Sequence, residues 1–333
     1  MANPAENNVK NESPAQENKM GVMPVGKLLF TMSLPIMISM LVQALYNVVD
    51  SMFVARVSEN ALTALSMAFP IQNLMIAVST GLGVGLNAVL SRALGAKDEK
   101  GVNRAATNGI MLLFICGLIF MLGGATLVRP YFEMQTDIEE IVKSGIDYTT
   151  IVMVGSMGIF MQILFERLLQ STGRTLLTMI SQGTGAIVNI IFDPIFIFGL
   201  FGFPKMGVAG AAYATILGQW VAAAIGLVMN IRKNPEVSIS MKGFRPHGAT
   251  LSRILSIGIP SVVMQSIGSV MTFLMNQILI AFSSTAVAVF GVYFKLQSFV
   301  FMPVFGLNNG TVPIVAYNFG ARRGDRMKKT IQY

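Results

Sequence analysis

The chain has 333 residues, of which 53% are hydrophobic and only 12% are charged, and its mean hydropathy is +0.63. This composition excludes an ordinary soluble domain and predicts an all-α protein that crosses a membrane several times. The net charge of +8 does not indicate a nucleic-acid partner, because the cations fall between hydrophobic runs, where membrane topology accounts for them.

The chain divides into a polar start and a series of apolar runs. Residues 1–26 are polar and predict a disordered cytoplasmic tail. Eight apolar runs follow, each long enough to span a bilayer, which takes about 20 residues. They are 28–53, 61–90, 105–127, 148–169, 176–200, 208–231, 254–282 and 286–316. The first six predict an N-terminal lobe at 27–232, a cytoplasmic linker follows at 233–253, and the last two begin a C-terminal lobe at 254–333.

The segments between the runs alternate in charge. Four segments are basic, and they hold Arg92 to Arg104, Arg167 and Arg174, Arg232 to Arg253, and Arg322 to Lys329. The intervening segments are acidic or carry very few charges. Because cytoplasmic segments carry an excess of Lys and Arg, this alternation predicts a multi-pass protein of the plasma (inner) membrane with a cytoplasmic N-terminus.

The chain contains an internal repeat with an offset of 225 residues. The offset places Pro35 on Pro260 and then, without a gap, Gly95-Ala96-Lys97 on Gly320-Ala321-Arg322. Duplication of a multi-helix unit is typical of secondary transporters. Since the second and eighth runs are equivalent, the unit has six helices. We therefore expect a two-lobe repeat of six-helix bundles whose second lobe is incomplete, with four more helices following Tyr333.

Asp193 is the most informative residue of the fifth run. An aspartate at membrane depth costs about 2.5–3.5 kcal/mol on insertion scales, so it usually serves a function. Asn189 lies four residues earlier, on the same helix face, and Pro194 leaves the carbonyl of Ile190 free. These groups predict a site for a proton or a small cation. The alternative is a polar cluster that only holds helices together.

Asp50 ends the first run, and the helix rise of about 1.5 Å per residue places it, like Asp193, in the outer half of the membrane. Two carboxylates in a low-dielectric cavity disfavour double ionisation and would titrate as a unit, which suits proton coupling. Together with the amide oxygen of Asn189 they could instead bind Na+. The alternative for Asp50 is an interfacial aspartate that is wetted at the helix end.

Three other polar residues need an explanation. Lys295 lies near mid-depth in the last run, where its charge cannot easily reach water. It either pairs with an acid in the expected further helices, helps to move a gate, or is structural. We take Lys295, together with Asn47 in the first run, as the candidates for substrate or gating contacts. Glu166 precedes Arg167 directly, and we expect the two to form a local interfacial ion pair.

The residues give little support to an enzyme. His247 is the sole histidine and lies in a polar segment, so neither a histidine metal site nor a Ser-His catalytic unit can form within the membrane. Cys116 is the sole cysteine, and the GxxxxGK phosphate loop is absent from the sequence. We therefore expect no enzymatic activity, no cofactor and no use of ATP by this chain.

Four segments resemble the multidrug and toxic compound extrusion (MATE) family of secondary transporters, and the resemblance covers about residues 22–333. The segments are Ser33-Leu34-Pro35 leading to Val49-Asp50, Ser91 to Ala96, Asn189 to Gly199, and Gly207 to Thr215. The resemblance implies a V-shaped pair of lobes, surrounded by lipid, that exports small cationic amphipathic drugs in exchange for H+ or Na+, and we expect a monomer. It also implies a first-lobe cation site made of Asp50, Asn189, Asp193 and Thr215, of which Thr215 owes most to the resemblance.

Two other functions remain open from the sequence. A lipid-linked oligosaccharide flippase of the same superfamily would need several cations in its cavity to hold a pyrophosphate, and only Lys295 qualifies. A non-transporting membrane fragment is the other alternative, because the second lobe is incomplete. The stretch from Ser261 to Phe273 contains no Asp or Glu, so we do not expect the second-lobe cation site of other members.

Overall fold

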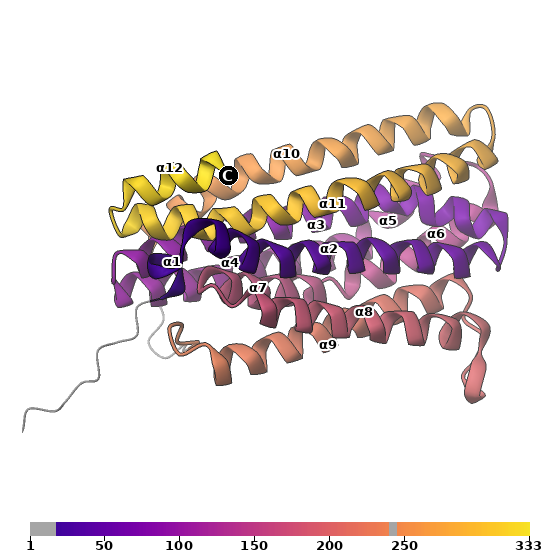
Figure 1. The fold of residues 1–333 in the computed structure, drawn as a ribbon. Helices are drawn as coiled ribbons and strands as arrows, with labels where there is room; N and C mark the ends of the chain where they lie inside the picture. Colours follow the sequence, from indigo (N-terminus) through magenta and orange to yellow (C-terminus); the bar gives the residue numbers. More distant parts are fainter. Residues whose placement is uncertain (1–17, 240–244) are drawn as a thin grey trace, which may run out of the picture.

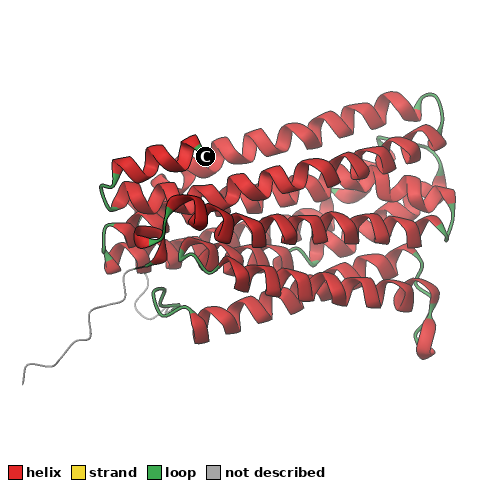
Figure 2. Ribbon diagram, in the orientation of Figure 1, coloured by secondary structure: helices red, strands yellow, loops and turns green. Residues whose placement is uncertain are grey.

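The computed structural model describes residues 18–239 and 245–333, and the regular secondary structure in these residues is entirely helical (Figures 1 and 2). The long helices lie side by side in one bundle, which confirms the expected all-α fold. The helices are α1 (Lys19–Val22), α2 (Val25–Ala55), α3 (Glu59–Gly95), α4 (Glu99–Thr126), α5 (Val128–Glu133), α6 (Glu139–Val154), α7 (Met157–Ser171), α8 (Thr175–Phe198), η1 (Leu200–Gly202), α9 (Val208–Lys233), α10 (Gly248–Ile280), α11 (Ser284–Gly320) and α12 (Gly324–Gln332).

Within the described residues, seven helices are long and apolar enough to cross a membrane, and an eighth span results if α6 and α7 count as one. These two helices meet at an angle of 45°, so the predicted span 148–169 is broken near its start. The Ser156 hydroxyl donates to the Gly117 carbonyl at 3.1 Å and fixes the break. A Cβ on Gly155 would overlap the end of the Ile216 side chain of α9, which would have to shift to make room for it.

The structure corrects the predicted boundary of the N-terminal tail. Residues 1–17 lie outside the described part of the chain, but α1 and the start of α2 occupy most of residues 19–26. The segment is ordered because Met20 is fully buried against Ile314 and Tyr317 of α11, a long-range contact that composition alone does not reveal. The linker also differs, since α9 ends at Lys233 and α10 begins at Gly248.

The internal repeat is visible in the helix boundaries. Both α3 and α11 contain 37 residues and begin 225 positions apart. Each is capped by a serine in the same extended conformation: Ser58 accepts a hydrogen bond from Ala61 N at 3.0 Å, and Ser283 accepts one from Ala286 N at 3.1 Å. The two copies therefore begin their second long helix in the same way.

We call α2–α9 the N-terminal unit and α10–α12 the C-terminal unit. The repeat is also visible in the contact between these two units. A Cβ on Gly95 would overlap the Tyr317 carbonyl, and a Cβ on Gly320 would overlap the Arg92 carbonyl. Because Gly320 and Tyr317 are the repeat partners of Gly95 and Arg92, one contact is the copy of the other. The close approach of α3 and α11 thus depends on a matched pair of glycines.

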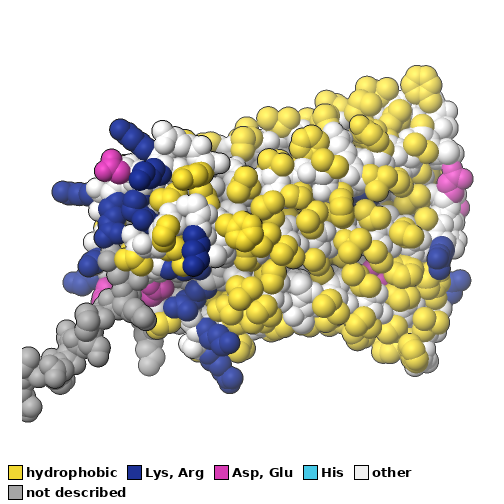
Figure 3. Space-filling view, in the orientation of Figure 1, with side chains coloured by type: hydrophobic (Ala, Val, Ile, Leu, Met, Phe, Trp, Pro, Cys, Tyr) yellow, Lys and Arg dark blue, Asp and Glu magenta, His cyan; other side chains and the backbone are white. Residues whose placement is uncertain are grey.

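Most Lys and Arg side chains in view gather at one end of the molecule (Figure 3). This end, called the basic end below, contains α1 and the ends of α3 and α11 (Figure 1). Between the two ends, apolar side chains cover most of the face in view. This distribution is the one that a protein spanning a bilayer needs.

Candidate functional site

The helical hairpin of α8 and α9 carries three of the four predicted cation-site residues. Gly199, with φ of +74°, ends α8 in the left-handed conformation that favours glycine. Further along the pair, the two helices approach through Gly185 and Gly218, where a Cβ on either residue would lie 2.6 Å from the carbonyl oxygen of the other. This backbone contact brings the polar faces of α8 and α9 together.

Asn189 stands at the centre of this face. Its side-chain nitrogen donates to Asp193 Oδ1 at 3.4 Å and to Thr215 Oγ1 at 3.3 Å. The contact with Asp193 joins residues one helical turn apart, as the sequence predicted. The contact with Thr215 joins α8 to α9. Asp193 is fully buried, and Asn189 is 2% exposed. The structure therefore brings Asn189, Asp193 and Thr215 together.

Asp50 reaches this cluster from α2. It is buried, and it lies close enough to Asp193 for the two carboxylates to interact electrostatically. Pro35 influences the path of α2, because it cannot bond the Thr31 carbonyl, which instead accepts from the Thr175 hydroxyl at 3.4 Å. The four predicted cation-site residues thus lie in one region where α2, α8 and α9 meet.

Several oxygen atoms in this region have no hydrogen-bond donor. They are Asp50 Oδ1, Asn189 Oδ1, Asp193 Oδ2 and, on the neighbouring turn of α9, Gln219 Oε1. A buried acceptor without a partner costs about 1–3 kcal/mol, so such a group calls for an occupant. A proton on one carboxylate would supply a single donor to this group, whereas a Na+ ion could bind several of the oxygens at once, and both fit the residues present. The described residues contain no cluster of three or more His, Cys, Asp or Glu suited to a metal ion.

A cavity of about 50 Å³ extends from this cluster into the N-terminal unit. Asn189, Thr215 and Gln219 line one part of it, and Gln43, Gln182 and Glu166 line another. Gln182 donates to Gln43 at 3.0 Å and so joins α8 to α2. A polar cavity of this size has room for water.

Glu166 and Arg167 do not form the local ion pair that we predicted. Glu166 accepts from Gln162 at 2.9 Å and faces the cavity, while Arg167 donates to Gln170 at 2.8 Å and to Asn309 of α11 at 3.2 Å. Both are buried rather than interfacial. Successive residues on a helix point about 100° apart, so the two side chains take different hydrogen-bond partners although both line the cavity. The sequence analysis therefore placed Glu166 wrongly. Its position within an apolar run was a signal that it could be buried.

The two predicted gating residues have different positions. Lys295 is buried on α11 and donates to the Ser51 hydroxyl of α2, next to Asp50, with which it interacts electrostatically. Its ammonium also lies 5.8 Å from the ring centre of Phe69. Asn47 is half-buried, one turn before Ser51, and does not line the cavity described above.

The spacing of α8 and α9 can be tested at Gly218. We expect Gly218→Val to push the helices apart, because the new Cβ meets both the Gly185 carbonyl and the Asn189 Cβ, the latter at 3.2 Å. The Asn189 to Thr215 contact should break, and the thermal unfolding temperature in detergent should fall by several degrees, since overpacking of this kind costs about 1–3 kcal/mol. Gly183→Val is the matched control, because a Cβ there meets nothing within 4 Å. An equal fall of the unfolding temperature in both variants would contradict the prediction.

Comparisons with known proteins agree with this architecture. The MatE family model matches residues 35–195 and 260–333. The multidrug export protein MepA of Staphylococcus haemolyticus (strain JCSC1435) is 29% identical over 311 residues, which cover 92% of this chain and 67% of that protein. MepA of Staphylococcus aureus (strain N315) is also 29% identical, over 315 residues that cover 93% of this chain and 68% of that protein.

Solved structures give the same result. An outward-facing multidrug resistance MATE family transporter of the MOP superfamily is 28% identical, with a TM-score of 0.86 over 96% of this chain and 70% of that chain. The MATE multidrug transporter DinF-BH is 30% identical, with a TM-score of 0.87 over 95% of this chain and 71% of that chain. These relatives are transporters, which supports the expectation that the chain is not an enzyme. The chain is therefore a multi-pass membrane protein that belongs to the MATE family of transporters.

Proposed function

We propose that this protein exports small cationic amphipathic compounds across the plasma membrane in exchange for H+ or Na+, by alternating access. The observation that carries the proposal is the buried group of donor-free oxygens on Asp50, Asn189 and Asp193, which suits a single monovalent cation or a proton. The MepA relatives are multidrug export proteins, which supports the substrate class.

The orientation of the chain forms part of the proposal. We assign the basic end to the cytoplasm, because Lys and Arg concentrate on the cytoplasmic side of membrane proteins. Asp50 and Asp193 then belong to the outer half of the membrane, and the cavity leads from them toward the cytoplasm. Binding of H+ or Na+ at the two carboxylates would change the N-terminal unit and favour release of the drug to the outside.

Export of a fluorescent organic cation from proteoliposomes tests this function. The protein is reconstituted, and efflux is followed under an imposed H+ gradient and, separately, under a Na+ gradient. Efflux that depends on one gradient supports antiport and identifies its ion. Absence of efflux under both gradients, with correctly folded and inserted protein, would overturn the proposal.

Lys295 has a specific role in this scheme. Its ammonium is held by Ser51 beside Asp50. It acts as an internal cation that repels a cationic substrate near Asp50. Because Lys295 comes from the C-terminal unit and Asp50 from the N-terminal unit, their attraction also links the two units. The role explains why a lysine is retained at a depth where its charge is costly.

The Lys295 role predicts a change in substrate affinity. We expect Lys295→Met to tighten binding of tetraphenylphosphonium on the order of tenfold, which corresponds to about 1.4 kcal/mol of removed repulsion. Lys295→Arg keeps the charge and serves as the control, with affinity close to that of the unchanged protein. Equilibrium binding to the purified protein measures both. Unchanged affinity in Lys295→Met would refute the role.

A further inference from the structure

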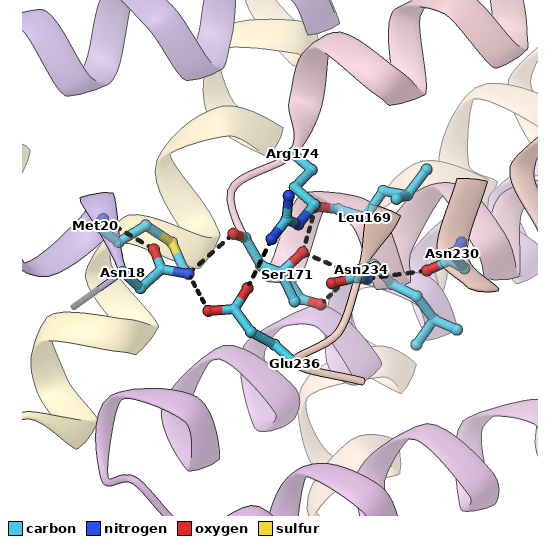
Figure 4. A network of polar contacts seen from close by, with 10 residues as sticks. Asn18, Met20, Leu169, Ser171, Arg174, Asn230, Asn234 and Glu236 are labelled. Atoms are coloured by element: carbon cyan, nitrogen blue, oxygen red, sulfur yellow. Dashed lines mark hydrogen bonds and ion pairs between the residues drawn. The ribbon is translucent and has the colours of Figure 1, made fainter. Parts of the chain in front are cut away.

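The short helix α1 and the residue before it contact both units at the basic end. On one side, the Asn18 side-chain nitrogen donates to the Thr172 carbonyl at 3.0 Å and to Glu236 Oε1 at 2.8 Å (Figure 4). Thr172 lies in the turn between α7 and α8, and Glu236 follows α9. Asn18 also caps α1, since its Oδ1 accepts from Met20 N at 3.0 Å.

Glu236 is itself held to the N-terminal unit. Its second carboxylate oxygen lies 3.7 Å from the Arg174 guanidinium, and both side chains are about one-third exposed or less. Two further bonds fix the segment before it: Asn234 donates to the Leu168 carbonyl at 3.2 Å (Figure 4), and Asn230 donates to the Phe165 carbonyl at 2.9 Å. The attachment of Asn18 on this side is therefore to a fixed surface.

On the other side, the carbonyls of the α1 segment accept hydrogen bonds from the C-terminal unit. The Met20 carbonyl accepts from Asn318 and from Arg326, each at 3.2 Å, and the Met23 carbonyl accepts from Arg326 at 2.6 Å. Arg323 also donates to the Gly21 carbonyl. Cations near the carbonyl end of a helix are favourable, because they meet the negative end of its dipole.

The Met20 side chain adds an apolar anchor to these polar contacts. It is fully buried in a cluster formed by Val25, Leu28, Leu29 and Met32 of α2 with Ile314 and Tyr317 of α11. The burial of this apolar side chain between α2 and α11 stabilises the docked position of α1. The segment is thus held by the buried Met20 side chain and by hydrogen bonds on both sides.

We propose that residues 18–23 form a gate that holds the two units together at the basic end and must undock before the transporter can open there. The gate rests on the alternating-access scheme proposed above, in which the units separate first at one end and then at the other. While the segment is docked, separation of α8 and α9 from α11 and α12 would break the bonds of Asn18 or those of Arg326. Loss of either set of bonds weakens the constraint, because the segment then links α8 and α9 to α11 and α12 less firmly.

Distances between spin labels across the basic end test the gate without requiring transport. In a variant without the native Cys116, labels are attached at Arg232→Cys on α9 and Lys328→Cys on α12, both exposed positions. Asn18→Ala removes the bonds to Thr172 and Glu236, and Arg326→Gln weakens the attachment to the C-terminal unit. We expect each to raise the population with a long label distance by about threefold or more, as a shift between two states.

The combined variant and a control make the test specific. Asn18→Ala with Arg326→Gln should give a larger population than either change alone, because each change removes a different set of bonds and leaves the other in place. Glu139→Gln, an exposed acid on α6, should leave the distances unchanged. Unchanged distances in both single variants, with thermal unfolding like that of the parent, would overturn the gate even if ion-driven export is observed. Altered distances in a protein that exports nothing would support the gate and reject the proposed function.

Discussion

Replacing Asp193 with asparagine should abolish ion-driven export while leaving the protein folded and inserted. Asparagine has nearly the same shape and can still accept from Asn189, whose donor now lies 3.4 Å from the carboxylate. It cannot bind a proton at the pH of the cell or supply a charge for Na+. We expect the gradient-dependent component of efflux to fall at least a hundredfold, to the level of empty liposomes, because coupling needs a group that changes its charge.

The control for this variant is Asp147→Asn. Asp147 is an exposed aspartate on α6, and its neutralisation removes the same charge from the chain. Export of a fluorescent organic cation from proteoliposomes measures both variants under the same gradient. Export by Asp193→Asn that matches export by Asp147→Asn would remove Asp193 from the coupling site and leave the polar cluster as a structural contact between α8 and α9.

Substituting alanine for Gly95 or Gly320 should have the largest effect on stability. In each case the new Cβ would overlap a backbone carbonyl, of Tyr317 or of Arg92, which cannot rotate away as a side chain can. Overpacking of this kind costs about 1–3 kcal/mol. Because each glycine is the repeat partner of the other, we expect both variants to lower the thermal unfolding temperature in detergent by similar amounts, several degrees each.

Gly183→Ala separates this steric effect from the general effect of replacing glycine in a helix. A Cβ at Gly183 meets nothing within 4 Å. Alanine is favoured over glycine in a helix interior by about 1 kcal/mol, so this variant should be neutral or slightly more stable. Unfolding temperatures of Gly95→Ala and Gly320→Ala that equal that of Gly183→Ala would show that α3 and α11 can move apart at no cost.

Much of the architecture could be predicted because it depends on local patterns. Apolar runs located the spans, since the bilayer sets their length. The one-turn spacing of Asn189 and Asp193 placed both on one face of α8, and their hydrogen bond has the predicted geometry. The repeat made the second and eighth runs equivalent, and the corresponding helices α3 and α11 have equal lengths. Each of these inferences uses neighbours in the sequence or a simple offset.

The rest depended on contacts between residues far apart in the sequence. Residues 19–22 adjoin a polar stretch and were grouped with it, whereas in the structure Met20 packs against α2 and α11. The break between α6 and α7 depends on Ser156 reaching Gly117, 39 residues away. Glu166 was assigned to its neighbour Arg167, whereas the fold gives it to Gln162 and the cavity. Sequence spacing does not determine such partners.

The matched glycine contacts have a consequence for the origin of the chain. When the same patch occurs on both halves and each half meets the other through it, the geometry is that of an isologous twofold interface. A single ancestral unit with the sequence features of α2 and α3 would therefore have been able to form a homodimer about an axis perpendicular to the membrane. Gene fusion would then have allowed the two halves to diverge, so that one half now carries Asp50 and the other Met275 at the equivalent position. In such a homodimer, a single pair of residues in the gene would have formed the same contact twice, once on each side of the twofold axis.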